Sequence, residues 1–314
     1  MEQDIKIKIA FWYHTCGMTQ DEIARRLNLT RQKVNAVIGT LKDDGIVTVS
    51  VRGLERLHLE WEHLLEDRFG LQRVIIAPVD DNAAFAFYKV ANAAAQYLEQ
   101  AITDGMTIGV SWGRTLAATV QEMRFARRSG CRVIQLVGAQ SMDGESAKSD
   151  SIARALAEKL DCPGYMLYAP VLVSNPMTRT LLLEEMSIRR SMEAMAQCDI
   201  GLFGIGMLNE DAPMCRMGYL SKEDLHRLNA EGFCCDAAMN PIRRDGTVDG
   251  CFLEERIINA NPETIRKMKN AVAVASGVGK AEAVKAVLRS GMMDTLIIDS
   301  ALASAVIRDM EELQ

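Results

Sequence analysis

The sequence contains no long run of apolar residues. Apolar stretches such as 133–139 and 271–275 are far shorter than the roughly 20 residues that a membrane-spanning helix needs. The first six residues, Met1 to Lys6, are acidic and polar, so they lack the basic and then apolar order of a secretory signal. We therefore expect a cytoplasmic protein without a membrane partner.

Recognisable metal-binding motifs are also missing. The eight cysteines include no Cys-Xaa-Xaa-Cys pair and no histidine partners at zinc-ligand spacing, so we expect neither a metal nor another cofactor. Most cysteines stand beside apolar residues, which is typical of buried, reduced thiols. The neighbouring pair Cys234 and Cys235 leaves a second interpretation open, that of a redox sensor.

Charge is spread unevenly along the chain. The 314 residues are 48% hydrophobic and 25% charged, which is globular composition and enough chain for one large domain and a smaller one. Residues 1–56 hold 9 Lys/Arg and 7 Asp/Glu, whereas residues 57–314 hold 27 and 35. Only the N-terminal segment therefore carries the net positive charge that favours a polyanion.

The N-terminal segment has the pattern of a helix-turn-helix. Apolar residues recur at helical spacing over 5–13, and Thr19 and Glu22 form the pattern of a capping box that opens a second helix. A tight turn at 28–29 precedes Thr30, which we expect to cap a third helix. Such a third helix enters the major groove of DNA.

The polar side of the third helix suits base and phosphate contacts. Arg31 and Gln32 can make bidentate contacts to guanine and adenine, whereas Lys33 and Thr30 more often hold phosphates. The alternative is a three-helix bundle with a solvated polar face. The candidate DNA-binding residues are Thr19, Gln20, Thr30, Arg31, Gln32, Lys33 and Asn35.

The residues that follow predict a wing and a linker. In residues 46–53 the side-chain character alternates and several residues are β-branched, as in a small hairpin or wing. The stretch from there to residue 70 has the apolar spacing of a helix, and such a helix can pair subunits. We expect a DNA-binding domain over 1–53, a linker or dimerisation helix over 54–70, and an effector domain over 71–314. A dimer is expected because paired recognition helices read two half-sites.

The large domain alternates short strands with longer helices. Continuous apolar strands between amphipathic helices favour a mostly parallel, Rossmann-like α/β sheet covered on both faces. The segment that holds Cys234 to Asn240 has few hydrophobic partners, and we expect it to be a loop. The expected strands are 74–77, 107–110, 133–137, 166–168, 200–204, 271–275 and 295–298, and the expected helices are 83–101, 116–127, 151–160 and 280–290.

Ligands in such sheets bind at the carboxyl ends of the strands, and three of these ends contain glycine. After the strand 107–110, the turn with Ser111, Gly113, Arg114 and Thr115 brings backbone amides and polar side chains to a helix start, where a phosphate can bind. An ordinary strand-to-helix turn is the alternative. Two further ends carry Gly138 with Gln140 and Gly277 with Lys280.

Lys280 stands at a helix start, where the helix dipole favours anions, so a bound anion would suit it; a solvated lysine is the alternative. Asp236 offers several acceptor sites to the hydroxyls of a sugar. We take both as candidate ligand-binding residues.

The sequence resembles the SorC-type family of sugar-binding regulators over nearly its whole length. The segments that carry the resemblance include MTQDEIARRLNLTRQKV, IGVSWGRTL, VIQLVGA, DIGLFGIG, FCCDAA and SGVGKAEAVKAVLRSGMMDTLIIDSALASAV. The resemblance implies a ligand domain related to ribose-phosphate isomerase and glucosamine-phosphate deaminase folds, a phosphorylated sugar or polyol as effector, and assembly as tetramers.

By the same resemblance, Ser111 to Thr115 match a phosphate loop, and Asp236 and Lys280 match an acidic residue and a lysine of the family's site. Cys235 departs from the pattern, because the family commonly has glycine there, and its sulfur is expected to narrow the pocket. The expected function is a transcriptional regulator of a carbohydrate or polyol catabolic operon that binds operator DNA.

The rival interpretation is an isomerase-like or deaminase-like enzyme with an appended helix-turn-helix. Such chemistry needs a base near the sugar. Three of the four histidines precede the ligand domain, and His226 lies in a helical surface pattern, which leaves Asp236 as a conceivable base. We therefore expect a regulator and not an enzyme.

Overall fold

The computed structural model describes residues 3–47, 58–79, 83–139 and 148–311. The chain divides into two compact units, residues 1–55 and 56–314, which are described separately below. Within the described ranges, no helix is both long enough and apolar enough to cross a membrane. From residue 48 onward the predicted wing lies outside the described residues, as does Gln140.

The N-terminal unit consists of three short helical segments around a small core. Helix α1 (Gln3–Ala10) continues into a π-helical turn, and helices α2 (Gln20–Leu27) and α3 (Arg31–Thr40) follow. Ile9, Ile23, Val34 and Leu41 are fully buried between them. The helix-turn-helix arrangement predicted from the sequence is confirmed.

Local capping fixes where α2 and α3 begin. The Thr19 hydroxyl accepts a hydrogen bond from the Glu22 amide at 3.3 Å, and the Glu22 carboxylate accepts one from the Thr19 amide at 2.8 Å. Thr30 accepts from the Lys33 amide in the same way at 3.3 Å, and Asn28 ends α2 in the left-handed conformation with φ 53°. Caps of this kind satisfy backbone amides that a helix start leaves without partners.

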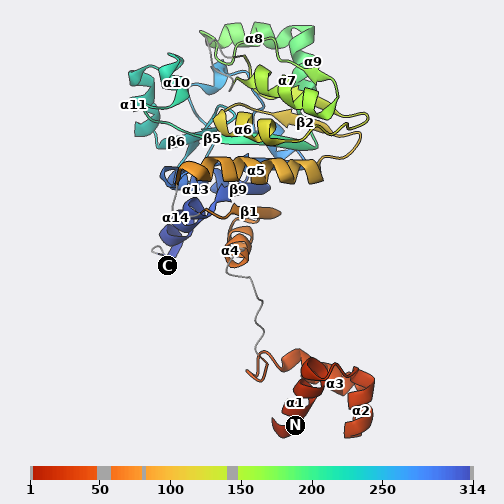
Figure 1. The fold of residues 1–314 in the computed structure, drawn as a ribbon. Helices are drawn as coiled ribbons and strands as arrows, with labels where there is room; N and C mark the ends of the chain where they lie inside the picture. The colour runs from red at the N-terminus through yellow and green to blue at the C-terminus, as the bar shows by residue number, and fades with distance from the viewer. Residues whose placement is uncertain (1–2, 48–57, 80–82, 140–147, 312–314) are drawn as a thin grey trace. The chain divides into compact units, whose positions relative to one another are not determined.

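The large unit contains a sheet in which seven strands run parallel in the order β1-β9-β8-β5-β2-β3-β4 (Figure 1). The strands of this path are β1 (Arg73–Ala77), β2 (Thr107–Val110), β3 (Arg132–Gln135), β4 (Gly164–Tyr165), β5 (Ile200–Met207), β8 (Asn270–Val274) and β9 (Thr295–Asp299).

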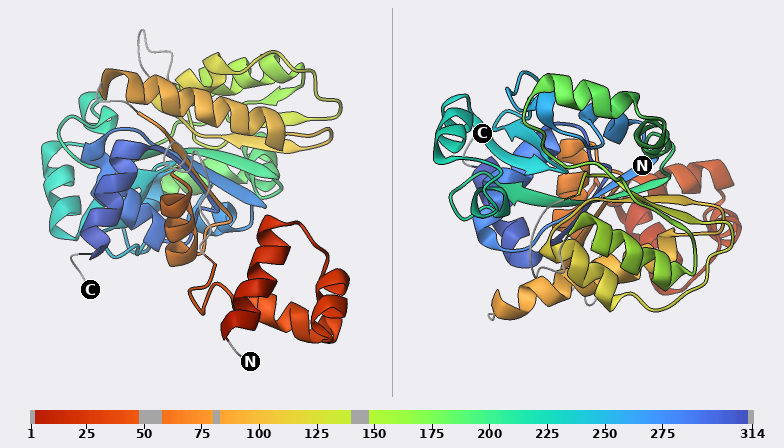
Figure 2. Two further views of the ribbon diagram at one scale, coloured as in Figure 1. Left: turned by 60° about the horizontal axis from the view of Figure 1, so that its bottom comes forward. Right: turned by 90° about the horizontal axis from the view of Figure 1, so that it is seen from above.

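Helices cover both faces of this sheet (Figure 2). Ala271 and Ala273 of β8 pack into one core and Val272 and Val274 into the other, as the alternation of a strand requires. One core includes α5 (Ala83–Ala101), α6 (Arg114–Glu122) and α7 (Ser149–Leu160), and the other includes α9 (Met186–Met195), α11 (Lys222–Ala230), α12 (Pro262–Arg266), α13 (Ala281–Arg289) and α14 (Ser300–Glu311). The predicted parallel α/β domain is confirmed.

The short helices α8 (Pro176–Glu184) and α10 (Pro213–Arg216) lie in the connections beside β5.

The segment from Cys234 to Asn240 was predicted as a loop, and this prediction is wrong. It forms a buried antiparallel hairpin of β6 (Phe233–Ala237) and β7 (Asn240–Arg243), and β6 also pairs with the end of β5. The two turn residues, Ala238 and Met239, have φ values of 49° and 68°. Turns of this type normally carry Asn-Gly or Asp-Gly, so Ala-Met conceals the hairpin.

Helix α4 (Leu59–Phe69) packs on the outer strand of the sheet. The Glu66 carboxylate accepts a hydrogen bond from the Val74 amide, and the Glu62 carboxylate accepts one from the Ile76 amide, both at 2.8 Å. Leu65 is fully buried in the core of the large unit. The helix expected in the linker thus belongs to the packed unit, and its role in pairing subunits stays a prediction.

Candidate functional site

A cavity of about 300 Å³ opens at the carboxyl ends of the central strands β2, β5 and β8. Its walls come from the turn after β2, the last residues of β5 with the loop that follows, the hairpin strand β6, and the turn after β8. Ligands in open parallel sheets bind where the direction of chain connection reverses, and these adjacent strands form such a point. A cavity of this size accommodates a small metabolite.

One wall of the cavity favours an anion. Gly113 is the N-cap of α6 with φ 125°, a conformation that residues with side chains rarely adopt, and it turns the chain directly from strand to helix. No side chain caps α6 among the described residues, so its first amides can donate to a ligand. Arg114 and Thr115 line the cavity beside them. Backbone amides, the positive end of a helix and a guanidinium therefore meet here.

Lys280 lines the cavity from the turn after β8. Its ammonium donates a hydrogen bond to the Ile205 carbonyl at 2.7 Å, and the turn is held by the Gly277 amide, which donates to the Asp299 carboxylate at 2.8 Å. Burial lowers the pKa of Lys280, and Arg114 lowers it further, whereas Asp236 opposes this change. A bound anion would stabilise the charged form of the lysine.

Asp236 faces Lys280 from strand β6. Burial raises the pKa of this carboxyl to about 6, although a 3.0 Å hydrogen bond from the Met239 amide and the charge of Lys280 both lower it. Gly206 lies opposite, and a β-carbon at that position would collide with the Asp236 carboxylate. At neutral pH the cavity therefore presents a buried carboxylate, which can accept hydrogen bonds from hydroxyl groups.

The structure brings together Gly113, Arg114, Thr115, Asp236 and Lys280 around this cavity. Two other predicted ligand residues, Ser111 and Gly138, lie outside the lining, and Gln140 lies outside the described residues. The Ser111 hydroxyl is buried outside the lining, and it has no hydrogen-bond partner within the described part of the chain. Gly138 also lies outside the lining, where its amide donates to the Ile258 carbonyl at 2.9 Å and its Cα packs against the backbone of Pro170 and Val171.

Several lining residues were not predicted. They come from the end of β5 and the following loop, from α10, from α5 and from the turn after β2: Met207, Asn209, Arg216, Phe87 and Trp112. For the wall formed by the end of β5, the local signal in the sequence is the pair Gly204 and Gly206, which lie at the end of an apolar strand. Arg216 adds a third cation to the cavity, but its helix reaches the site only through the fold.

The pair Cys234 and Cys235 does not line the cavity. The Cys235 sulfur points into the core, where it lies 3.5 Å from the Ala283 carbonyl oxygen, so it does not narrow the pocket as expected. A hydrogen bond with Cys235 lowers the pKa of Cys234, with a smaller effect of Arg244, whereas the pKa of Cys235 is raised by the same bond and by burial.

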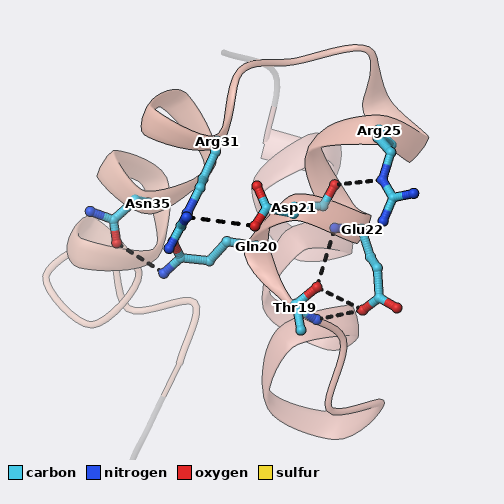
Figure 3. Close-up of polar contacts among 7 residues, drawn as sticks. All are labelled: Thr19, Gln20, Asp21, Glu22, Arg25, Arg31 and Asn35. Atoms are coloured by element: carbon cyan, nitrogen blue, oxygen red, sulfur yellow. Dashed lines mark hydrogen bonds and ion pairs between the residues drawn. The ribbon is translucent and has the colours of Figure 1, made fainter.

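The predicted DNA-binding residues of α3 are exposed. Arg31, Gln32, Lys33 and Asn35 reach solvent, whereas Val34 and Val37 of the same helix are buried. Thr19 and Thr30 also serve as helix caps, and Gln20 contacts Asn35 (Figure 3). This face can present amide and guanidinium groups to base edges.

Comparison with known proteins finds a matching family model for each of the two units. A family model described as "Putative sugar-binding domain" matches residues 56–308, and one described as "Crp-like helix-turn-helix domain" matches residues 12–67. The Deoxyribonucleoside regulator of Bacillus subtilis is 26% identical over 98% of this chain and 99% of the relative. The Erythritol catabolism regulatory protein EryD of Brucella abortus is also 26% identical, over 98% of this chain and 97% of the relative.

Solved structures share the fold. The full-length sorbitol operon regulator SorC of Klebsiella pneumoniae matches 98% of this chain and 100% of its own, with a TM-score of 0.76 and 20% identity. A domain of a possible sugar-binding transcriptional regulator from Arthrobacter aurescens matches 79% of this chain and 97% of its own, with a TM-score of 0.73 and 28% identity. These proteins are named as transcriptional regulators and not as enzymes. The chain belongs to the SorC-type family of sugar-binding transcriptional regulators, with a helix-turn-helix unit at its N-terminal end and a sugar-binding domain after it.

Proposed function

We propose that this protein regulates a carbohydrate or polyol catabolic operon, and that a phosphorylated sugar or polyol in the cavity controls its affinity for operator DNA. The observation that carries this proposal is that cationic groups, a helix start and a buried carboxylate line the same cavity. Arg114, Lys280 and the start of α6 suit a phosphate, and Asp236 suits the hydroxyl groups of the same molecule.

An unphosphorylated polyol is the second candidate effector. The buried carboxylate of Asp236 favours it, and one relative is named for erythritol catabolism. A thermal-shift screen of free and phosphorylated sugars and polyols separates the two candidates. If only phosphorylated compounds raise the melting temperature, the effector carries a phosphate.

Replacement of Arg114 by alanine is expected to weaken binding of the phosphorylated effector by about tenfold to a hundredfold, because a hydrogen bond to a charged group contributes about 1.5–3 kcal/mol. The measurement is the effector-induced shift in melting temperature, followed by titration calorimetry. Lys222→Ala, which removes an exposed cation of α11 outside the cavity, is the control. Unchanged affinity in Arg114→Ala would exclude this residue from the phosphate site.

We further propose that the helix-turn-helix reads the operator from a dimer or tetramer in the cytoplasm. Paired recognition helices match a two-fold symmetric operator. The coupling between effector and DNA is then a difference in effector affinity between the DNA-bound and free states.

On the DNA side, Arg31→Ala and Gln32→Ala are expected to reduce operator discrimination by about 1–3 kcal/mol each. Lys33→Ala is expected to weaken binding to all sequences alike and to lower the salt dependence. Fluorescence anisotropy with operator and scrambled duplexes at several salt concentrations measures both effects. The effector-induced thermal shift should survive in all three variants, and its loss would indicate that the substitution disturbed more than the DNA-binding face.

A further inference from the structure

A hydrogen bond joins the two helices of the DNA-binding face. Gln20 is the first residue of α2, and its side-chain Nε2 donates to the Asn35 Oδ1 of α3 at 3.0 Å (Figure 3). One turn before Asn35, Arg31 forms an ion pair with Asp21 at 3.6 Å. The first two residues of α2 therefore contact the exposed side chains of α3 that are four residues apart and share one helical face.

This bond restricts rotation of the Asn35 side chain and, in the arrangement that the structure has, sets the direction of its amide. An isolated amide can exchange its oxygen and nitrogen by rotation, and it then has no fixed preference between donor and acceptor bases. In the structure, the oxygen of Asn35 faces the donor of Gln20, so the two Nδ2 hydrogens and the second lone pair of Oδ1 are the groups that can contact DNA.

We propose that Asn35 reads one adenine in each operator half-site and that Gln20 is the positioning residue that orients its amide. Nδ2 donates to adenine N7, and Oδ1 accepts from the adenine N6 amino group while it also accepts from Gln20. This inference rests on the proposed operator binding, and it adds the identity of a base and the residue pair that selects it.

The other bases fit this arrangement less well. Guanine presents two acceptors, N7 and O6, so its O6 would face the Asn35 oxygen without a hydrogen. Thymine presents an acceptor and a methyl group, and cytosine presents a donor without the neighbouring acceptor. Adenine alone offers the acceptor and donor pair that an oriented asparagine matches.

Asn35 also has the position that such a contact needs. It is exposed on α3, whereas its neighbour Val34 and the following Val37 are buried against the rest of the unit. Recognition helices contact base edges with residues near their N-terminal end, and Asn35 is the fifth residue of α3.

The test begins with the full-length protein and a library of random DNA duplexes. The selected duplex is then altered at each base pair in turn, and affinities are measured at one salt concentration. For the unaltered protein, one A·T pair in each half-site should lose about tenfold to a hundredfold in affinity when it is changed to G·C. Asn35→Ala should remove the preference at that pair only, and Gln20→Ala should reduce it at the same pair.

Asn35→Asp gives a sharper readout. A carboxylate can still accept from Gln20 but offers only acceptors to DNA, so the preference at the same base pair should move from adenine to cytosine, whose N4 amino group is a donor. Lys33→Ala is the matched control, since it changes an exposed residue of the same helix and should lower affinity for every duplex without a change in base preference. Far-UV circular dichroism checks that each variant keeps its helices.

The possible outcomes separate this inference from the proposed function. Retention of every base preference by Asn35→Ala, or an unchanged preference in Gln20→Ala, would overturn the inference while operator binding stands. If the unaltered protein selects no sequence, operator binding and the inference both fail.

Discussion

Replacement of Gly206 by alanine is expected to abolish the effector response while the protein stays folded. Gly206 pairs with Asp236 across the β5–β6 ladder, and a β-carbon there would collide with the Asp236 carboxylate. The carboxylate would have to leave its place, where the Met239 amide donates to it at 3.0 Å. Binding that depends on several placed polar groups loses about a hundredfold or more when one of them is displaced.

Gly279→Ala is the matched control for this variant. It also adds a methyl group to a glycine near the site, but no atom lies within 4 Å of the added carbon. Effector titration calorimetry and far-UV circular dichroism on both variants test the prediction. Normal effector affinity in Gly206→Ala would mean that the position of Asp236 does not matter for binding.

Replacement of Asp236 by asparagine is expected to stabilise the protein at neutral pH and to weaken effector binding. The pKa of Asp236 is about 6 in the folded protein, above its ordinary value of 3.8. A raised carboxyl pKa means that the folded state binds the proton more tightly than the unfolded state does. The free energy of unfolding therefore falls as pH rises from about 4 to about 6 and stays lower above that range, by about 3 kcal/mol at this site.

Urea unfolding at pH 4 and pH 7.5 tests this prediction. Asp236→Asn should be more stable than the unaltered protein by about 3 kcal/mol at pH 7.5, and the difference should nearly vanish at pH 4. Asp249→Asn, which changes an exposed carboxylate, should show no such difference. A loss of stability in Asp236→Asn at pH 7.5 would show that the electrostatic attraction between Asp236 and Lys280 outweighs the cost of burying the carboxylate.

The parts of the fold that local chemistry determines were predictable. Thr19 and Thr30 cap their helices through side chains three residues from the amides they bind, and strands such as β1 and β9 are β-branched runs of ordinary length. The strand expected at 166–168 is an exception, because the structure has the two-residue strand β4 at Gly164–Tyr165 instead. The hairpin β6–β7 was missed because its turn residues are Ala238 and Met239. Their strained conformation is held from outside the hairpin, where the Asn259 amide donates to the Ala238 carbonyl at 2.7 Å.

The residues of the candidate site also divide into those that the local sequence marks and those that only the folded chain brings together. Gly113, Arg114 and Lys280 lie in strand-to-helix turns, so neighbouring residues mark them as candidate anion contacts, and all three line the cavity. Ser111 stands two residues from Gly113, but its amide donates to the Leu202 carbonyl as part of the sheet, and its hydroxyl is buried away from the cavity. The pairing register of the sheet determines which way the Ser111 side chain points, and this register cannot be predicted from the sequence of the turn. Arg216 reaches the site through chain-distant packing, which no local pattern reveals.

The two glutamates of α4 also bear on the solubility of the protein. An outer strand with bare backbone amides is a template on which another chain can add a strand, and sheets that leave it open tend to aggregate. In this fold the carboxylates of Glu62 and Glu66 occupy the amides of Val74 and Ile76 on the open side of β1. Loss of these two carboxylates would leave the Val74 and Ile76 amides free to pair with a strand of another chain, so α4 protects the sheet edge against aggregation.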